Sequence, residues 1–374
     1  MIDIASFSAD WLDQKKKHYG KDPGLMETMV HALYLLERLK ISGLDFIFKG
    51  GTSLILLLDQ SKRFSVDVDI VVSPSVSRPE LEEYLAKINE SSVFHGMQLD
   101  ERRSYKPGIP KAHYKFFFTS VFSSRNKEGD VISNPEREIL LDIHFSENHY
   151  PALVNLPIRT EWVIQKDDPI FVLMPDVNSI AGDKLTAFAP NTTGVPYGTD
   201  KEKEIVKQLF DVGCLFDSLT DLEIFKKSYI ESVKAEISYR PERNIHSVQQ
   251  VLQNTIDTSV LIAKKDILKG DVEKANFAEI SNGLKQFISF VFVGKFGISE
   301  AQVAGSKAAL LAAVVLIDYT GELQKFNPDI PLSEYLITHP DYNFLNKRLK
   351  YVSQGEALFY WHQTINLLYP ENNK

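Results

Sequence analysis

The sequence of 374 residues contains a single cysteine, Cys214. One cysteine cannot form an intrachain disulfide, and it excludes a metal site built from several thiolates. Long hydrophobic runs are also lacking, because the longest, such as 308–317, fall well short of the roughly 20 apolar residues that a membrane span needs. The N-terminus lacks the basic start and apolar core of a signal peptide. We therefore expect a soluble, cytoplasmic protein.

The chain has no excess of positive charge, since its formal net charge at pH 7 is -8. This balance argues against a protein that coats nucleic acid, which would carry a basic surface. Short basic stretches at 13–21 and 346–351 could still contact RNA, although such runs are more often solvated faces. With 44% hydrophobic and 25% charged residues, the composition is that of an ordinary globular protein.

Strand and helix patterns are mixed in the first part of the chain, whereas helical periodicity dominates after it. Strands are expected at 44–48, 65–72, 92–100, 113–122 and 137–145, and helices at 24–41, 78–90, 177–189, 203–219, 223–240, 248–268, 277–296, 300–326 and 355–369. The strands at 113–122 and 137–145 are separated by turn residues, which predicts a hairpin with a long loop. The predicted fold is α/β (α+β), with a mixed-sheet domain at 1–170 followed by a mainly helical domain at 171–374.

Two carboxylates, Asp67 and Asp69, stand in the predicted strand "SVDVDIVV". Side chains two positions apart in a strand point to the same face, and nearby like charges oppose each other's ionisation. A cation or water is therefore expected between them. Asp142 in "ILLDIHF" repeats the pattern on another strand. Carboxylates of this kind bind Mg²⁺ together with substrate phosphates, whereas the alternative is an edge strand with an acidic exposed face.

The stretch "GGTS" precedes these carboxylates and follows the predicted strand at 44–48. We expect it to turn into a helix that begins near Thr52 or Ser53. Gly50 and Gly51 would let backbone N–H groups approach an anion, which the positive end of the helix dipole also favours. A phosphate site followed by a metal-binding pair fits a nucleoside triphosphate. A tight turn from strand to helix would require glycine in any case.

The combined stretch resembles the first motif of the AbiEii/AbiGii nucleotidyltransferase toxins, which are part of the DNA polymerase β-like nucleotidyltransferase superfamily. The matching residues are Lys49, Gly50, Gly51, Thr52, Ser53, Leu54, Arg63, Ser65, Asp67 and Asp69. Asp142 matches the third acidic strand of the superfamily, and "AGDKLTAF" places Lys184 at the family's motif lysine. The segment "VKQLFDV" supplies Lys207 and Asp211 of a further motif, but it has Gln208 where an acidic residue is usual.

The resemblance implies catalytic roles for five residues and nucleotide contacts for six. The catalytic residues would be Asp67, Asp69, Asp142, Lys184 and Asp211, of which the first three would bind metal. The nucleotide contacts would be Gly50, Gly51, Thr52, Arg63, Ser65 and Lys184. The hydroxyls could instead cap a helix or turn, Arg63 could form a structural salt bridge, and Lys207 with Asp211 could only stabilise their helix.

The function implied by the resemblance is transfer of a nucleoside monophosphate from a nucleoside triphosphate to an RNA acceptor such as tRNA, with Mg²⁺ or Mn²⁺ as cofactor. Such a protein would be the toxin of a bacterial toxin–antitoxin or phage-defence system, with an antitoxin encoded nearby and no membrane partner. Two alternatives stay open, a small-molecule nucleotidyltransferase of the antibiotic type and a nucleotide-binding module of the same fold without catalysis.

Overall fold

The computed structural model describes residues 1–59, 62–90, 93–125 and 128–370, and the chain forms two compact units. The first unit contains Met1–Asp176 and Ser289–Gly294, and the second contains Val177–Ile288 and Lys295–Lys374. The sequence placed the boundary near residue 170, whereas the units divide after Asp176. Mixed sheet and C-terminal helices confirm the predicted fold class.

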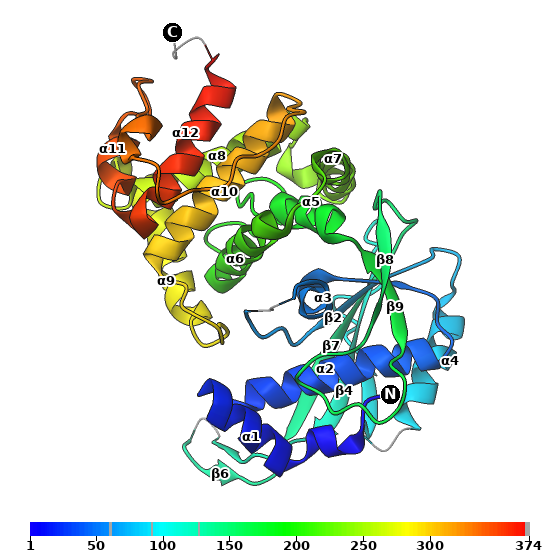
Figure 1. Ribbon diagram of the computed structural model, residues 1–374. Helices are drawn as coiled ribbons and strands as arrows, with labels where there is room; N and C mark the ends of the chain where they lie inside the picture. The colour runs from blue at the N-terminus through cyan, green and yellow to red at the C-terminus, as the bar shows by residue number, and fades with distance from the viewer. Residues whose placement is uncertain (60–61, 91–92, 126–127, 371–374) are drawn as a thin grey trace. The chain divides into compact units, whose positions relative to one another are not determined.

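The first unit is built on a five-stranded sheet with the order β1-β2-β7-β4-β3 (Figure 1). Its strands are β1 (Ile47–Lys49), β2 (Val68–Val72), β3 (Gly96–Leu99), β4 (Lys111–Thr119) and β7 (Glu136–Phe145). Only the β2–β7 pair is parallel, and the other pairs are antiparallel. The β4–β7 pairing confirms the predicted hairpin. The long loop of this hairpin carries a small ladder of β5 (Ser124–Arg125) and β6 (Val131–Ile132). Residues 126–127 of the loop lie outside the described part of the chain, and so does Ser92 of the predicted strand at 92–100.

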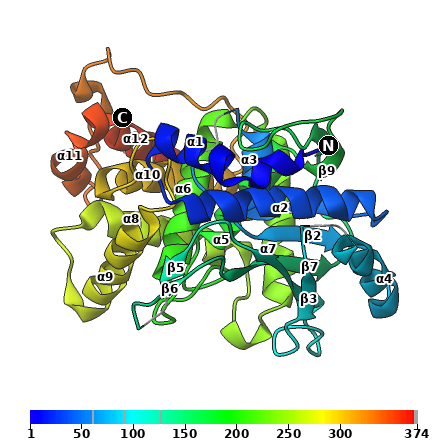
Figure 2. The same ribbon diagram turned by 90° about the horizontal axis from the view of Figure 1, so that it is seen from below.

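Helices cover the apolar face of this sheet. The helices of the unit are α1 (Ala9–Tyr19), α2 (Pro23–Ile41), α3 (Gly50–Leu57) and α4 (Arg78–Asn89), with a short 3-10 helix at Ile4–Phe7. Residues Ile139, Leu141 and Ile143 of β7 are buried in one hydrophobic core with side chains from α2 and α4, and α1 lies alongside α2 (Figure 2). Alternation then places the even-numbered residues of β7, including Asp142, on the opposite face.

A second small ladder was not predicted from the sequence. It pairs β8 (Leu153–Pro157) with β9 (Phe171–Pro175), and β9 lies beside β1. Both strands are short and contain or adjoin proline, so their strand signal is weak.

The second unit is helical. It contains α5 (Val177–Ala187), α6 (Glu202–Ser218), α7 (Leu222–Ser238), α8 (Val248–Lys264), α9 (Gly270–Phe287), α10 (Ile298–Leu316), α11 (Phe344–Leu349) and α12 (Glu356–Leu368), with 3-10 helices at Pro241–Arg243, Leu332–Tyr335 and Val352–Gly355. Helix α10 is central and packs against α6, α8 and α12 (Figure 1). Among the described residues it is a helix long and apolar enough to cross a membrane, but 78% of its most apolar window is buried, as in the core helix of a globular unit.

The predicted helix at 277–296 is wrong in its last part. Helix α9 ends at Phe287, and the chain then contributes Ser289–Gly294 to the first unit. There Phe64 donates its backbone N–H to the carbonyl of Phe290 (2.8 Å), and Phe292 donates to the carbonyl of Lys62 (2.9 Å). The side chain of Phe292 packs among Phe64 and Trp162, so aromatic burial in the other unit outweighs the helical pattern here.

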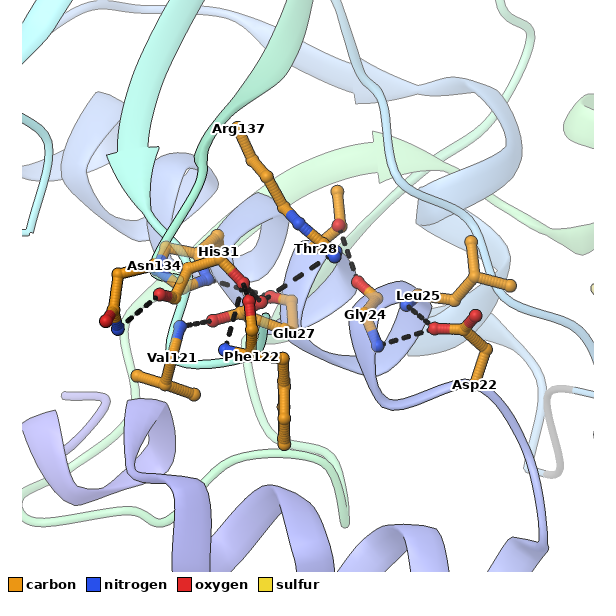
Figure 3. A network of polar contacts seen from close by, with 11 residues as sticks. Asp22, Gly24, Leu25, Glu27, Thr28, His31, Val121, Phe122, Asn134 and Arg137 are labelled. Atoms are coloured by element: carbon orange, nitrogen blue, oxygen red, sulfur yellow. Dashed lines mark hydrogen bonds and ion pairs between the residues drawn. The ribbon is translucent and has the colours of Figure 1, made fainter. Parts of the chain in front are cut away.

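Polar side chains of α2 anchor the end of β4 (Figure 3). The carboxylate of Glu27, which is fully buried, accepts hydrogen bonds from the hydroxyl of Ser120 (2.5 Å) and from the backbone N–H of Val121 (2.7 Å). The guanidinium of Arg137 lies 3.8 Å from the same carboxylate. One turn further along, His31 donates from Nδ1 to the Glu27 carbonyl (2.8 Å) and stacks on Phe118. Burial lowers the pKa of His31 to about 4, against the opposing effect of that hydrogen bond and with a further lowering by Arg137.

This buried histidine predicts a pH dependence of stability. Because its folded pKa lies below the ordinary value of 6.5, the unfolded chain binds a proton more readily, so the stabilisation is fully present above pH 6.5 and is lost as the pH falls towards 4. We expect the free energy of unfolding of the first unit to fall by about 3 kcal/mol more in the natural protein than in His31→Phe over this interval. Urea unfolding at each pH measures this, with His18→Phe as the same substitution at an exposed position. Equal slopes for the natural protein and His31→Phe would contradict the assignment.

Candidate active site

Four polar residues form a row across the sheet of the first unit. The register places Lys49 of β1 opposite Asp69 of β2, Asp69 opposite Asp142 of β7, and Asp142 opposite His113 of β4. Residues paired in this way point to the same face, so the two carboxylates are neighbours with a nitrogen-bearing side chain on each outer side. Neighbouring like charges are unfavourable unless a cation or a donor lies close to them. Asp69 and Asp142 therefore form a pair of adjacent carboxylates within the row on the polar face of the sheet.

The glycine turn lies directly against Asp69. Gly50 has a φ of +79°, and a Cβ built on it would clash with the carboxylate and lie 2.6 Å from Asp69 Cγ. A Cβ on Gly51 would lie 2.5 Å from Nη2 of Arg63 and 2.8 Å from Oγ of Ser65. Glycine at both positions thus lets the backbone approach a carboxylate on one side and a guanidinium on the other. Helix α3 begins at Gly50, so the predicted start near Thr52 or Ser53 is two to three residues late.

Hydroxyl groups tie this turn to the segment before β2. The hydroxyl of Thr52 lies 2.9 Å from that of Ser65 and also donates to the backbone carbonyl of Asp67. Arg63 is only 4% exposed and donates from Nη1 to the carbonyl of Phe64 (2.9 Å). These contacts hold the residues before β2 against the start of α3, so that the polar side chains of the two segments lie next to each other.

The predicted strand at 65–72 is too long, because β2 begins at Val68. The alternation argument therefore applies to Asp69 but not to Asp67, which lies just before the strand. Asp67 is nevertheless close to the turn through its backbone carbonyl, which accepts from Thr52. The structure brings the seven predicted residues Gly50, Gly51, Thr52, Arg63, Ser65, Asp67 and Asp69 to one end of β2, next to Asp142.

The donor set for a cation here is small. Among the described residues, no group of three or more His, Cys, Asp or Glu side chains lies in a metal-holding arrangement. Mg²⁺, however, is bound in proteins through one or two carboxylates and completes its octahedron with water and substrate phosphates. Asp69 and Asp142 are register partners on adjacent strands, and they lie beside a glycine turn in which a Cβ on Gly50 would clash with Asp69. This arrangement fits that mode of binding.

Lys184 and Asp211 belong to the second unit. Lys184 of α5 places Nζ 3.1 Å from Oδ2 of Asp211 in α6, and both side chains are buried. Nζ also lies 3.4 Å from Oε1 of Gln208, the residue at the position where the family motif has an acid. Lys207 forms its ion pair with Glu204 rather than with Asp211. Lys184 is thus held by one carboxylate and one neutral amide.

Two residues of the row were not assigned to the site from the sequence. Lys49 was recognised only as part of the motif, and His113 was not singled out. His113 stands on the same face as Lys111 and Lys115 by alternation, but only the register of β4 against β7 places it next to Asp142. His144 is buried two positions after Asp142.

Gly50→Ala tests the close packing of the turn. The substitution would strain a positive φ and force the Asp69 side chain aside, which we expect to lower the free energy of unfolding by about 2–4 kcal/mol. Gly20→Ala is the matched control, because Gly20 also has a positive φ (+63°) but no atom lies within 4 Å of an added Cβ. We expect about 1 kcal/mol there. Urea unfolding compares the two, and equal losses would show that Asp69 does not pack on Gly50.

Comparison with known proteins adds one match. The model of the family described as "Nucleotidyl transferase AbiEii toxin, Type IV TA system" matches residues 34–332. This range includes every residue of the row, the glycine turn and the Lys184–Asp211 pair. No curated protein matches the chain.

Proposed function

The chain belongs to the AbiEii nucleotidyl transferase toxin family of type IV toxin–antitoxin systems, and we therefore propose that it transfers a nucleoside monophosphate from a nucleoside triphosphate to a hydroxyl of an RNA, such as a tRNA. Family membership makes it a toxin nucleotidyltransferase with a cognate antitoxin. We place its action in the cytoplasm. The observation that carries the proposal is the in-register pair Asp69–Asp142 beside the glycine turn.

The residues of the first unit have complementary tasks in this reaction. Gly50 and Gly51 at the start of α3 would receive triphosphate oxygens on backbone N–H groups. Arg63, next to Gly51, would offset phosphate charge, and Ser65 would donate its hydroxyl hydrogen bond, whereas Thr52, whose hydroxyl donates to the Asp67 carbonyl, would hold the turn in place. The attacking oxygen forms a bond to the α-phosphorus, the bond to the pyrophosphate oxygen breaks, and the acceptor proton goes to solvent.

Asp69 and Asp142, with Asp67 beside them, would hold Mg²⁺ or Mn²⁺ together with the triphosphate. When bound, such ions stabilise the charge on the attacking and leaving oxygens of an in-line displacement. The phosphate role of Lys184 as a point charge is implied by the family motif alone, and within the second unit Asp211 would orient its ammonium group.

The test is a transfer assay with each α-labelled nucleoside triphosphate, Mg²⁺ and total RNA, run beside Asp69→Asn. Label on RNA with the natural protein alone supports the proposal. Pyrophosphate release with label on a small acceptor would indicate an antibiotic-type transferase. Triphosphate binding without pyrophosphate release, with or without RNA, would indicate a binding module and overturn the proposal.

A further inference from the structure

A histidine holds one of the two neighbouring carboxylates. Nδ1 of His113 in β4 is hydrogen bonded to Oδ1 of Asp142 in β7, and the two side chains are only 10% and 27% exposed. A carboxylate at neutral pH only accepts, so Nδ1 is the nitrogen that carries the hydrogen. The bond makes the two oxygens of Asp142 different from each other, because Oδ1 is engaged on the β4 side.

The backbone of His113 is itself fixed by the connection between β3 and β4. Its N–H donates to the hydroxyl of Ser104 (2.9 Å), and its carbonyl accepts from the N–H of Asp100 (2.8 Å). Ser104 in turn donates to the carbonyl of Asp100 (2.7 Å). The imidazole therefore stands on a strand that is bonded both to β7 and to a folded turn, which restricts the positions open to it.

The position of this bond relative to Asp69 gives it a functional meaning. Asp69 is the register partner of Asp142 on β2, on the side opposite to β4. With Oδ1 bonded to a donor on the β4 side, Oδ2 is the oxygen of Asp142 that a cation held between Asp142 and Asp69 would use. A carboxylate that could rotate would lose orientational freedom on binding the cation.

We propose that His113 is a positioning residue, which through its bond to Asp142 fixes the orientation in which that carboxylate receives a divalent cation. This inference rests on the proposed nucleotidyl transfer. It gives His113 no contact with the substrate, so its effect must appear in cation binding. Partners that orient metal-binding side chains typically contribute 10–100-fold to metal affinity.

The experiment measures Mn²⁺ affinity by electron paramagnetic resonance in the presence of an α,β-methylene triphosphate analogue. His113→Phe removes the donor, and His113→Gln moves it to the position of Nε2, so each is expected to raise the dissociation constant about tenfold. His113→Asn places an amide nitrogen near the position of Nδ1, and it is expected to stay within about threefold of the natural protein. Rescue by asparagine alone separates orientation of Asp142 from a general loss of folding.

His95→Phe is the matched control. His95 also bonds a carboxylate of β7, that of Glu136 (2.9 Å), but at the other end of the strand, so its loss is expected to leave Mn²⁺ affinity unchanged. The double variant His113→Phe/Asp142→Asn is expected to bind Mn²⁺ no more weakly than Asp142→Asn alone, since His113 acts only through Asp142.

Different failures point to different errors. Natural Mn²⁺ affinity in His113→Phe, or equal weakening in His113→Asn and His113→Phe, overturns the role of His113. If Asp69→Asn and Asp142→Asn also bind Mn²⁺ like the natural protein, the proposed cation site itself is wrong. Weakened binding in those two variants with no effect of His113→Phe overturns the positioning role alone.

Discussion

Asp69→Asn is expected to lower the rate of nucleotide transfer by roughly a thousandfold and to leave the fold as stable as before, or slightly more stable. The amide keeps the shape of the side chain but loses the charge that would hold a cation and, through it, the triphosphate. Loss of one such preorganised electrostatic contact typically costs a factor of about 100–1,000 in rate, and a metal site adds to this.

The stability side of this prediction follows from the row across the sheet. Asp69 stands between Lys49 and Asp142, and without a bound cation its charge is opposed by that of Asp142. Directly opposite like charges in a sheet are destabilising, so removal of one of them offsets the lost attraction of Lys49. Function and stability therefore make opposite demands on Asp69, as is common at catalytic positions.

Single-turnover transfer and urea unfolding of the same preparations measure the two effects. Glu138→Gln is the matched control, because Glu138 is on the same face of β7 but pairs with Lys115 (2.8 Å) at a partly exposed position. We expect its transfer rate to stay within about twofold, since exposed ion pairs contribute little. Equal activity of Asp69→Asn and the natural protein would remove Asp69 from the chemistry.

The sequence predicted those parts of the site that depend on local order along the chain. The alternation in "ILLDIHF" correctly places Asp142 opposite the apolar face of β7, and the two glycines mark a turn with a positive φ at Gly50. Both signals depend on only a few neighbouring residues. The first is the alternation of side chains along a strand, and the second is the backbone conformation that glycine permits.

Contacts between distant segments could not be predicted in the same way. His113 is 29 residues before Asp142, and only the register of β4 against β7 makes them neighbours. A shift of one residue in that register would have placed His113 on the other face, and no turn rule fixes the register across a loop of this length. The helix predicted through Ser289–Gly294 is wrong for a related reason, because its helical pattern says nothing about Phe64 and Trp162, which are distant in the sequence but pack on Phe292 within the first unit.

Asp211→Leu is expected to give the largest loss of stability in the second unit, about 3–5 kcal/mol in the free energy of unfolding. Asp211 is 1% exposed and Lys184 is 7% exposed at their side chains, so removal of the carboxylate leaves a buried ammonium group beside the neutral amide of Gln208. A neutral acceptor does not compensate for the hydration free energy that a buried ammonium group loses. Lys184→Met should cost a similar amount, because it leaves the carboxylate of Asp211 buried.

The double variant Lys184→Met/Asp211→Leu separates the structural role of the pair from its proposed catalytic role. Replacement of a buried ion pair by apolar side chains of similar volume is often nearly neutral, so we expect the double variant to be at least about 2 kcal/mol more stable than either single one. Urea unfolding measures this difference in stability, with hydrogen exchange of the backbone amides of α5 and α6 as the probe. Lys234→Met is the control, because the exposed Lys234–Glu231 pair should contribute less than about 1 kcal/mol.

The transfer activity of the same double variant distinguishes a catalytic role of Lys184 from a purely structural one. If Lys184 contacts the triphosphate, the double variant should be stable and inactive, which no stabilising ion pair alone would produce. If it is stable and fully active, Lys184 and Asp211 hold α5 against α6 and take no part in the reaction.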